Sequence, residues 1–379
     1  LSALLLLQIV RLVKGRDDWL TIGSLGLLLG LGVLAKVNVA VAAAPAGLAL
    51  LYAAWKREGA LAGAVRRSAP WLALVTALAL GISGWWFVRN AILHGDPTGW
   101  SFILKTNALR EGPLTMEVLW WLVRGLFKSF WLAWIGIKLD APLYWALLAL
   151  CLVSFAGLLR LGLRRRRELD RDTWAGLGLL ALQIALVFAS LLKWTATVLG
   201  TDQARLLYPA LPSLLAFLAL GLFQWAPARR EGWLAGGLAL AFLALAVAAP
   251  LAYIAPAHAG PTPISESKLR EIAAPADVIF GDRIRLVGFR AEPAAQAGGW
   301  LEVDLYWQAL RPLERDYWLT LRLAGEDPAQ PLALKDGSPS AGLDTTDRWK
   351  PGEIIPSHHR RPVPAETPAG AYWIWIGVH

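Results

Sequence analysis

The sequence predicts an all-α bundle of several membrane-spanning helices, followed by an all-β sandwich outside the membrane. Apolar runs recur in this chain of 379 residues, 56% of which are hydrophobic. Many of these runs approach the roughly 20 residues that a helix needs to cross a bilayer. Basic loops alternate with loops that carry few cations. After residue 256, short segments with alternating polarity replace the long apolar runs.

The predicted helical part covers residues 1–254. The chain opens inside an apolar run and closes inside an alternating one, residues 371–379, so we expect it to be a fragment of a longer protein. The apolar segments are residues 1–10, 19–35, 37–55, 69–88, 141–160, 174–193, 206–225 and 233–254.

The charge pattern predicts how these segments are oriented. Four short loops hold 15 of the 24 Lys and Arg residues of 1–256, and cytoplasmic loops carry such an excess of cations. Alternation then places the turn at Lys36, residues 89–140, residues 194–205 and everything after 256 outside. The loop cations are Arg11, Lys14, Arg16, Lys56, Arg57, Arg66, Arg67, Arg160, Arg164 to Arg167, Arg171, Arg229 and Arg230.

Two segments leave alternatives open. Residues 19–55 fit two short spans that turn at Lys36, or one long helix with a re-entrant piece. Lys36 itself is either a snorkelling lysine at an external turn or a cation that faces a lipid phosphate. In residues 113–138, apolar and basic side chains recur at helical spacing. This pattern fits a helix in the plane of the membrane surface, or an amphipathic helix that caps the bundle.

The C-terminal part begins with a linker, residues 255–275, which opens with a stretch rich in Pro and Gly. Alternating segments at 283–289, 301–307, 317–323 and 372–378 then predict antiparallel strands in a β-sandwich over 276–379. Residues 1–256 carry 24 Lys and Arg against 12 Asp and Glu, whereas residues 257–379 carry 13 against 16. The basic excess therefore belongs to the membrane part, and nucleic acid is not an expected partner.

The candidate site residues lie in the loops predicted to face outside. Arg89 and Arg205 are placed to bind a phosphate at the membrane surface, because guanidinium groups match phosphate in a bidentate geometry; interfacial anchoring is the alternative. Asp96 is a candidate general base or ligand for a divalent cation, or else a turn residue in Asp-Pro-Thr-Gly. The remaining loop candidates are Asn90, His94, Asp202 and Gln203.

Other kinds of chemistry are not expected. His358 and His359 have neither metal-binding spacing nor, we expect, nearby acidic partners, so no metal site is predicted there. Glycine-rich nucleotide loops are absent from the sequence, which argues against a soluble nucleotide as the immediate donor.

Three motifs resemble bacterial membrane glycosyltransferases of the GT-C class. The closest similarity is to the protein O-mannosyltransferase and aminoarabinose-transferase-like family (family 39), and it covers roughly residues 1–254. The motifs are GLLLGLGVLAK at Gly26–Lys36, WFVRN at Trp86–Asn90 with the following Gly95-Asp96-Pro97, and QARLLYPALP at Gln203–Pro212.

The resemblance implies an enzyme that transfers a sugar from a polyprenyl-phosphate carrier to a glycan, lipid or protein acceptor, at the outer face of the plasma membrane. It implies that Lys36, Arg89 and Arg205 contact the donor phosphate. The catalytic carboxylate of the family is expected in a loop before residue 1. The alternative is a non-catalytic scaffold or translocator in the assembly of cell-envelope polysaccharide, with the β-sandwich as a binding module.

Overall fold

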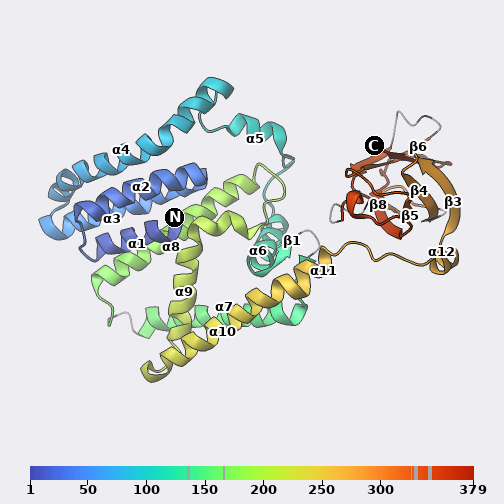
Figure 1. The fold of residues 1–379 in the computed structure, drawn as a ribbon. Coiled ribbons are helices and arrows are strands. Elements are labelled where there is room, and N and C mark those ends of the chain that lie inside the picture. The colour runs from blue at the N-terminus through green and yellow to red at the C-terminus, as the bar shows by residue number, and fades with distance from the viewer. Residues whose placement is uncertain (135–136, 165–166, 293, 326, 328–331, 340–343) are drawn as a thin grey trace. The chain divides into compact units, whose positions relative to one another are not determined.

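The computed structural model describes residues 1–134, 137–164, 167–292, 294–325, 327, 332–339 and 344–379. The contacts divide the chain into two compact units, Leu1–Ala249 and Pro250–His379. Figure 1 shows helices throughout the first unit and mainly strands in the second.

Ten α-helices are described in the first unit, and each predicted apolar segment is helical. Among the described residues, six helical segments are long and apolar enough to cross a membrane: Val37–Glu58, Leu61–His94, Ala141–Arg164, Arg171–Thr195, Ala204–Phe223 and Glu231–Ala257. The helices are α1 (Ser2–Val13), α2 (Trp19–Ala35), α3 (Ala43–Glu58), α4 (Leu61–His94), α5 (Trp100–Thr106), α6 (Met116–Trp131), α7 (Ala141–Arg164), α8 (Arg171–Thr195), α9 (Leu211–Phe223) and α10 (Glu231–Ala248), with 3₁₀ segments η1 (Val37–Ala42), η2 (Ala204–Ala210) and η3 (Ala228–Arg230).

The ends of these helices follow from local sequence. The Asp18 side chain accepts a hydrogen bond from the Thr21 amide at the start of α2, and Asp170 does the same for the Thr173 amide of α8. Such caps satisfy amides that have no partner within the helix. Gly95 ends α4 with a φ of 67°, a left-handed conformation that glycine adopts without strain.

Small residues let the helices pack closely. The apolar core of the first unit is built from side chains of α1, α2, α3, α4 and α8. A Cβ at Gly30 of α2 would lie 2.9 Å from the Ala79 carbonyl oxygen of α4, and a Cβ at Gly157 of α7 would lie 1.9 Å from the Gly221 carbonyl oxygen of α9. Glycine is therefore required where these backbones touch.

The chain turns at Lys36, as in the alternative in which residues 19–55 form two helical segments rather than one long helix. Helix α2 ends at Ala35, Lys36 is extended, and η1 leads directly into α3. The turn is tight, because a Cβ at Gly32 would lie 2.7 Å from the Val39 side chain.

The helix predicted over residues 113–138 is shorter in the structure, so the prediction was wrong at its C-terminal end. Helix α6 stops at Trp131, and β1 (Ala133–Trp134) pairs with β2 (Ile137–Lys138). Leu122 and Leu126 of α6 are buried against Leu191 of α8, which matches a helix packed on the bundle. Ile135 of the predicted pattern and two of the predicted loop cations, Arg165 and Arg166, lie outside the described residues.

The described part of the second unit forms two antiparallel sheets, with strand orders β3-β4-β5-β8 and β7-β6-β9. Strands β4, β5, β6 and β9 were predicted, whereas β3, β7 and β8 were missed. Side chains of both sheets share one apolar core. The strands are β3 (Ala274–Phe280), β4 (Ile284–Ala291), β5 (Trp300–Ala309), β6 (Leu319–Ala324), β7 (Ala333–Gly337), β8 (Ile354–Pro362) and β9 (Trp373–Val378).

The alternation predicted for β5 is confirmed in part: Leu301, Val303, Leu305 and Trp307 are buried, but Tyr306, predicted on the other side with Glu302 and Asp304, is buried as well. The region predicted as a linker is partly ordered. It contains the short helices α11 (Ala255–Ala257) and α12 (Glu266–Ile272), and Ser265 caps α12 by accepting a hydrogen bond from the Lys268 amide.

Candidate functional site

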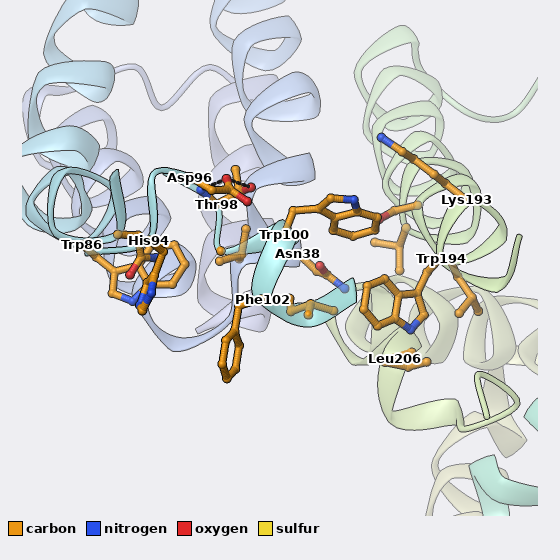
Figure 2. A pocket seen from close by; sticks show the side chains of 17 residues that line it. Asn38, Trp86, His94, Asp96, Thr98, Trp100, Phe102, Lys193, Trp194 and Leu206 are labelled. Carbon is orange, nitrogen blue, oxygen red and sulfur yellow. Dashed lines mark hydrogen bonds between the residues drawn. The ribbon is translucent and has the colours of Figure 1, made fainter. Parts of the chain in front are cut away.

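A pocket of about 880 Å³ opens where α4, α5 and α8 meet the loops. Its lining comes from the C-terminal turns of α4, the turn after α4, helix α5, the C-terminal turns of α8, the start of η1, and η2. Figure 2 shows Trp86 and His94 on one side and Trp194 and Leu206 on the other, with Trp100 between them. Four sequence regions that lie far apart in the chain thus contribute to one cavity.

One face of α4 forms the first wall. Trp86, Asn90 and His94 follow one another at intervals of four residues, so they lie on one side of the helix. The Asn90 side chain is 5% exposed and donates a hydrogen bond to the Pro97 carbonyl oxygen at 3.4 Å. His94 is exposed, and its ring lies 6.1 Å from that of Phe102. Asn90 and His94, both predicted, are thus brought to the pocket.

Asp96 organises the turn that follows α4. Its Oδ1 accepts hydrogen bonds from the amide and the hydroxyl of Thr98, at 2.9 and 2.8 Å, and its Oδ2 accepts one from the Ser101 amide at 2.7 Å. The bond from the Ser101 amide, followed by those from Thr98, lowers the pKa of Asp96 from 3.8 to about 2. A carboxylate with so low a pKa is a weak base. Of the roles that the sequence left open for Asp96, this geometry fits the turn residue.

Aromatic rings from α5 and α8 form the second wall. The Trp100 and Trp194 rings pack edge to face, with centroids 5.3 Å apart. The Lys193 ammonium lies 6.0 Å from the Trp100 ring centroid, within the range of a cation–π contact. This side of the pocket therefore offers apolar ring surface beside a positive charge.

Backbone hydrogen bonds tie the two predicted external loops together. The Arg110 amide donates to the Thr197 carbonyl oxygen, and the Leu199 amide donates to that of Ala108, each at 2.9 Å. The Arg110 guanidinium adds a bond of 2.6 Å to the Thr195 carbonyl oxygen. The loop after α5 is thus anchored to the end of α8 and to the segment that follows it; Lys193 and Trp194 lie in the last turn of α8.

Lys36 and Arg205 meet beside the pocket. The Lys36 ammonium donates a hydrogen bond to the Arg205 carbonyl oxygen at 3.1 Å, and the residues that follow each of them, Val37 and Leu206, line the cavity. The pKa of Lys36 is lowered, mainly by burial and to a lesser extent by the positive charge of Arg205. Two of the three predicted phosphate contacts are therefore neighbours.

The other predicted residues lie elsewhere. Arg89 is exposed and is not among the lining residues, although Asn90 is. Asp202 belongs to the contact between η2 and α6, where its carbonyl oxygen accepts a hydrogen bond from the Ser129 hydroxyl at 3.0 Å. The Gln203 side chain donates to the Gly200 carbonyl oxygen at 3.0 Å. The structure does not bring Arg89, Asp202 or Gln203 into the pocket lining.

Metal ligands are not gathered in the part of the chain that the structure describes: no group of three or more His, Cys, Asp or Glu side chains could hold an ion there. The divalent cation at Asp96 stays a prediction. The expectation that His358 has no nearby acidic partner was wrong, because its Nδ1 lies 2.7 Å from Asp304 Oδ1 on the neighbouring strand. Asp304 is far away in sequence, and strand pairing brings it close.

Several lining residues were not expected from the sequence, notably Asn38, Trp100 and Trp194. A tryptophan near a span end also anchors helices at the interface, so the residue type alone does not indicate a pocket. The edge-to-face contact between α5 and α8 identifies these two rings, and it depends on tertiary structure.

No protein-family model matches this chain, and neither a curated protein nor a solved structure shows significant similarity to it. The resemblance to membrane glycosyltransferases therefore stays a prediction based on the three motifs.

Proposed function

We propose that this protein is a multi-pass glycosyltransferase of the plasma membrane. In this proposal its pocket takes the sugar of a polyprenyl-phosphate donor and transfers it, at the outer face, to a glycan, lipid or protein acceptor. The second unit is a β-sandwich on the outer side. The observation that carries the proposal is the pocket of about 880 Å³ at the loop ends of helices long enough to span a membrane.

The pocket lining suits a sugar. Trp86, Trp100 and Trp194 supply flat apolar rings, while Asn38 and Asn90 supply amide groups. A pyranose has a C–H face that packs on an aromatic ring and hydroxyls that need hydrogen-bond partners, and small-molecule sites combine these two kinds of group.

The Lys36–Arg205 pair suits the donor phosphate. Two cations held close together repel, which is one reason that the pKa of Lys36 is lowered. An anion beside them would remove this repulsion and would gain charge-assisted hydrogen bonds. A phosphate at this point would leave its sugar next to Val37 and Leu206, at the pocket lining.

The transfer breaks the bond between the anomeric carbon and the phosphate oxygen, and polyprenyl phosphate leaves. A bond forms from the same carbon to the acceptor oxygen, whose proton goes to a base. Asp96 is poorly suited to be that base, since both of its oxygens hold the turn and its pKa is about 2.

A transfer assay tests the proposal. Purified protein in lipid is given undecaprenyl-phosphate-linked glucose, mannose or aminoarabinose with membrane-extracted acceptors. We expect Lys36→Ala and Arg205→Ala each to lower kcat/KM for the donor about tenfold or more, because each removes a charged hydrogen bond worth about 1.5–3 kcal/mol. Lys105→Ala, an exposed cation of α5 outside the lining, is the matched control.

Equal transfer by wild type and both variants would contradict the phosphate role. One observation favours the alternative of a non-catalytic scaffold or translocator: Asp96 is the acidic residue among the described lining residues, and it is committed to its turn. Donor binding that Lys36→Ala weakens, without transfer to any acceptor, would support that alternative.

A further inference from the structure

The outward face of the three-stranded sheet carries three exposed tryptophans. Along β9, Ile374 and Ile376 pack in the shared core, while Trp373 and Trp375 alternate with them and are 63% and 41% exposed. Alternate residues of a strand point to opposite faces, so both indoles are on the outer side. We call this surface, with Trp318 and the polar residues described next, the tryptophan face.

Trp318 continues the same face. It precedes β6, and its backbone exchanges two hydrogen bonds with His379, at 2.8 and 3.0 Å, which extend the ladder between β6 and β9. Leu319, the next residue, is buried in the core, whereas Trp318 is 49% exposed.

Polar side chains lie between the indoles. The strand register places Arg322 opposite Trp375, and Thr320 opposite both Gly377 and Asp336. Side chains at directly opposed positions lie about 5 Å apart. The Thr320 hydroxyl donates to Asp336 Oδ1 at 2.6 Å. Hydrogen-bonding groups therefore adjoin the aromatic rings along the face.

Buried side chains support the face from behind. Leu319, Leu321 and Leu323 of β6 are between 0% and 6% exposed, and β6 is hydrogen-bonded on both sides, to β7 and to β9. A binding surface that is already ordered loses little conformational entropy when a ligand arrives.

Three classes of partner could cover exposed indoles. A membrane surface favours many Lys and Arg around the aromatic residues, but Arg322 and Asp336 balance each other on this face and residues 257–379 carry 13 Lys and Arg against 16 Asp and Glu. A protein interface favours an apolar centre with a polar rim, but here the polar groups alternate with the rings. A pyranose chain matches both features, with apolar C–H faces and hydroxyls at the edges.

We propose that the tryptophan face binds an uncharged glycan built of pyranose sugars. Trp373 and Trp375 are two residues apart on one strand, which separates their positions by about 6.6 Å. One sugar cannot stack fully on both rings, so the site requires at least two linked sugars. The proposal does not rest on glycosyl transfer by the helical unit, and binding is measured without any donor.

Calorimetric titration tests the proposal with the full chain in a detergent that has no sugar headgroup. The probes are cellohexaose, maltohexaose and mannohexaose, with glucose and mannose as single-sugar controls. We expect at least one hexaose to bind and the monosaccharides to bind at least about tenfold more weakly. Trp375→Ala and Trp318→Ala should each weaken hexaose binding about tenfold, the change that corresponds to loss of one stacking contact.

Two further variants separate stacking from folding. Trp375→Tyr keeps an aromatic ring and should retain most of the affinity. Trp300→Ala is the matched control, since Trp300 is 49% exposed, as Trp318 is, but lies on β5 of the other sheet.

The proposal is overturned if wild type binds none of the three hexaoses, or if Trp300→Ala weakens binding as much as Trp375→Ala. It is also overturned if Trp375→Ala and wild type bind equally. Loss of self-association in the Trp375 variant, without a change in hexaose binding, would assign the face to a second copy of the chain. Quenching by brominated lipid in nanodiscs that is greater for wild type than for Trp375→Ala would assign the face to the membrane.

Discussion

At the scale of single residues, the Asp96 carboxylate orders the connection from α4 to α5. It accepts hydrogen bonds from the amides of Thr98 and Ser101. The three lining residues after it, Thr98, Gly99 and Trp100, are therefore positioned by one side chain. A residue in the pocket can thus be essential to its shape without taking part in chemistry.

Replacing Asp96 by Ala should raise the hydrogen-exchange rates of the Thr98 and Ser101 amides, because their acceptor is removed. Asp96→Asn, which keeps one acceptor oxygen, should have an intermediate effect. Glu111→Ala, in the loop between α5 and α6, is the control. Unchanged exchange at both amides in Asp96→Ala would refute the structural role.

The same bonds predict a pH dependence. The pKa of Asp96 is lowered from 3.8 to about 2 in the folded state, so the carboxylate stabilises the fold fully above pH 3.8. This contribution falls as the pH is lowered from 3.8 through about 2, where the folded protein takes up the proton. Exchange protection at Ser101, corrected for the intrinsic rate, should decline over this interval in wild type but not in Asp96→Ala.

At the scale of elements, the contact between α7 and α9 has no room for a side chain. Gly157 and Gly221 bring the two backbones together, and Ser154 donates a hydrogen bond to the Leu218 carbonyl oxygen at 2.9 Å. A Cβ at Gly221 would lie 2.1 Å from the Ser154 carbonyl oxygen. The contact depends on backbone proximity rather than on the size of apolar side chains.

Gly157→Ala and Gly221→Ala should each lower the stability of the helical unit by about 1–3 kcal/mol, the usual cost of overpacking. Gly162→Ala, also on α7, is the control, because a Cβ there meets nothing within 4 Å; it should be neutral or slightly stabilising, since alanine favours a helix. Thermal unfolding in detergent measures the difference. Equal unfolding temperatures for all three variants would mean that the two helices do not touch here.

The sequence predicted the helices well because apolar length is a strong local signal, as in Ala141–Arg164. The faces of those helices were not predictable. The apolar residues of helix α4 are spread around its circumference, so hydrophobicity alone does not show which side of the helix lines the pocket. The missed strand β8 contains Ser357 and His359, polar residues that are buried and hide the expected alternation.

The candidate site was predicted in part, for a similar reason. Asn90 and His94 lie in the last turns of α4 and Asp96 follows the helix, and all three were found by position. Lys36 and Arg205 were proposed separately, and only the fold shows that they adjoin. Trp100 and Trp194 have no polar signal in the sequence, and their contact joins elements almost a hundred positions apart.

At the scale of the whole molecule, the charge pattern predicts that the second unit is outside. Proteinase K added to intact spheroplasts should remove residues after about 258, in the stretch rich in Pro and Gly, and leave the loop that precedes α8 uncut. Permeabilised cells, in which both sites are cleaved, are the control. Full protection of the second unit in intact spheroplasts would refute the orientation.

The hydrogen bond between Arg110 and Thr195 joins residues 85 positions apart, and that between Lys36 and Arg205 joins residues 169 apart. During synthesis, α4 and α5 leave the ribosome long before α8 and η2. One wall of the pocket therefore exists early, while the opposite wall is added only after α6 and α7 have been made. A nascent chain that ends before α8 lacks the second wall, so the pocket is completed only late in biogenesis.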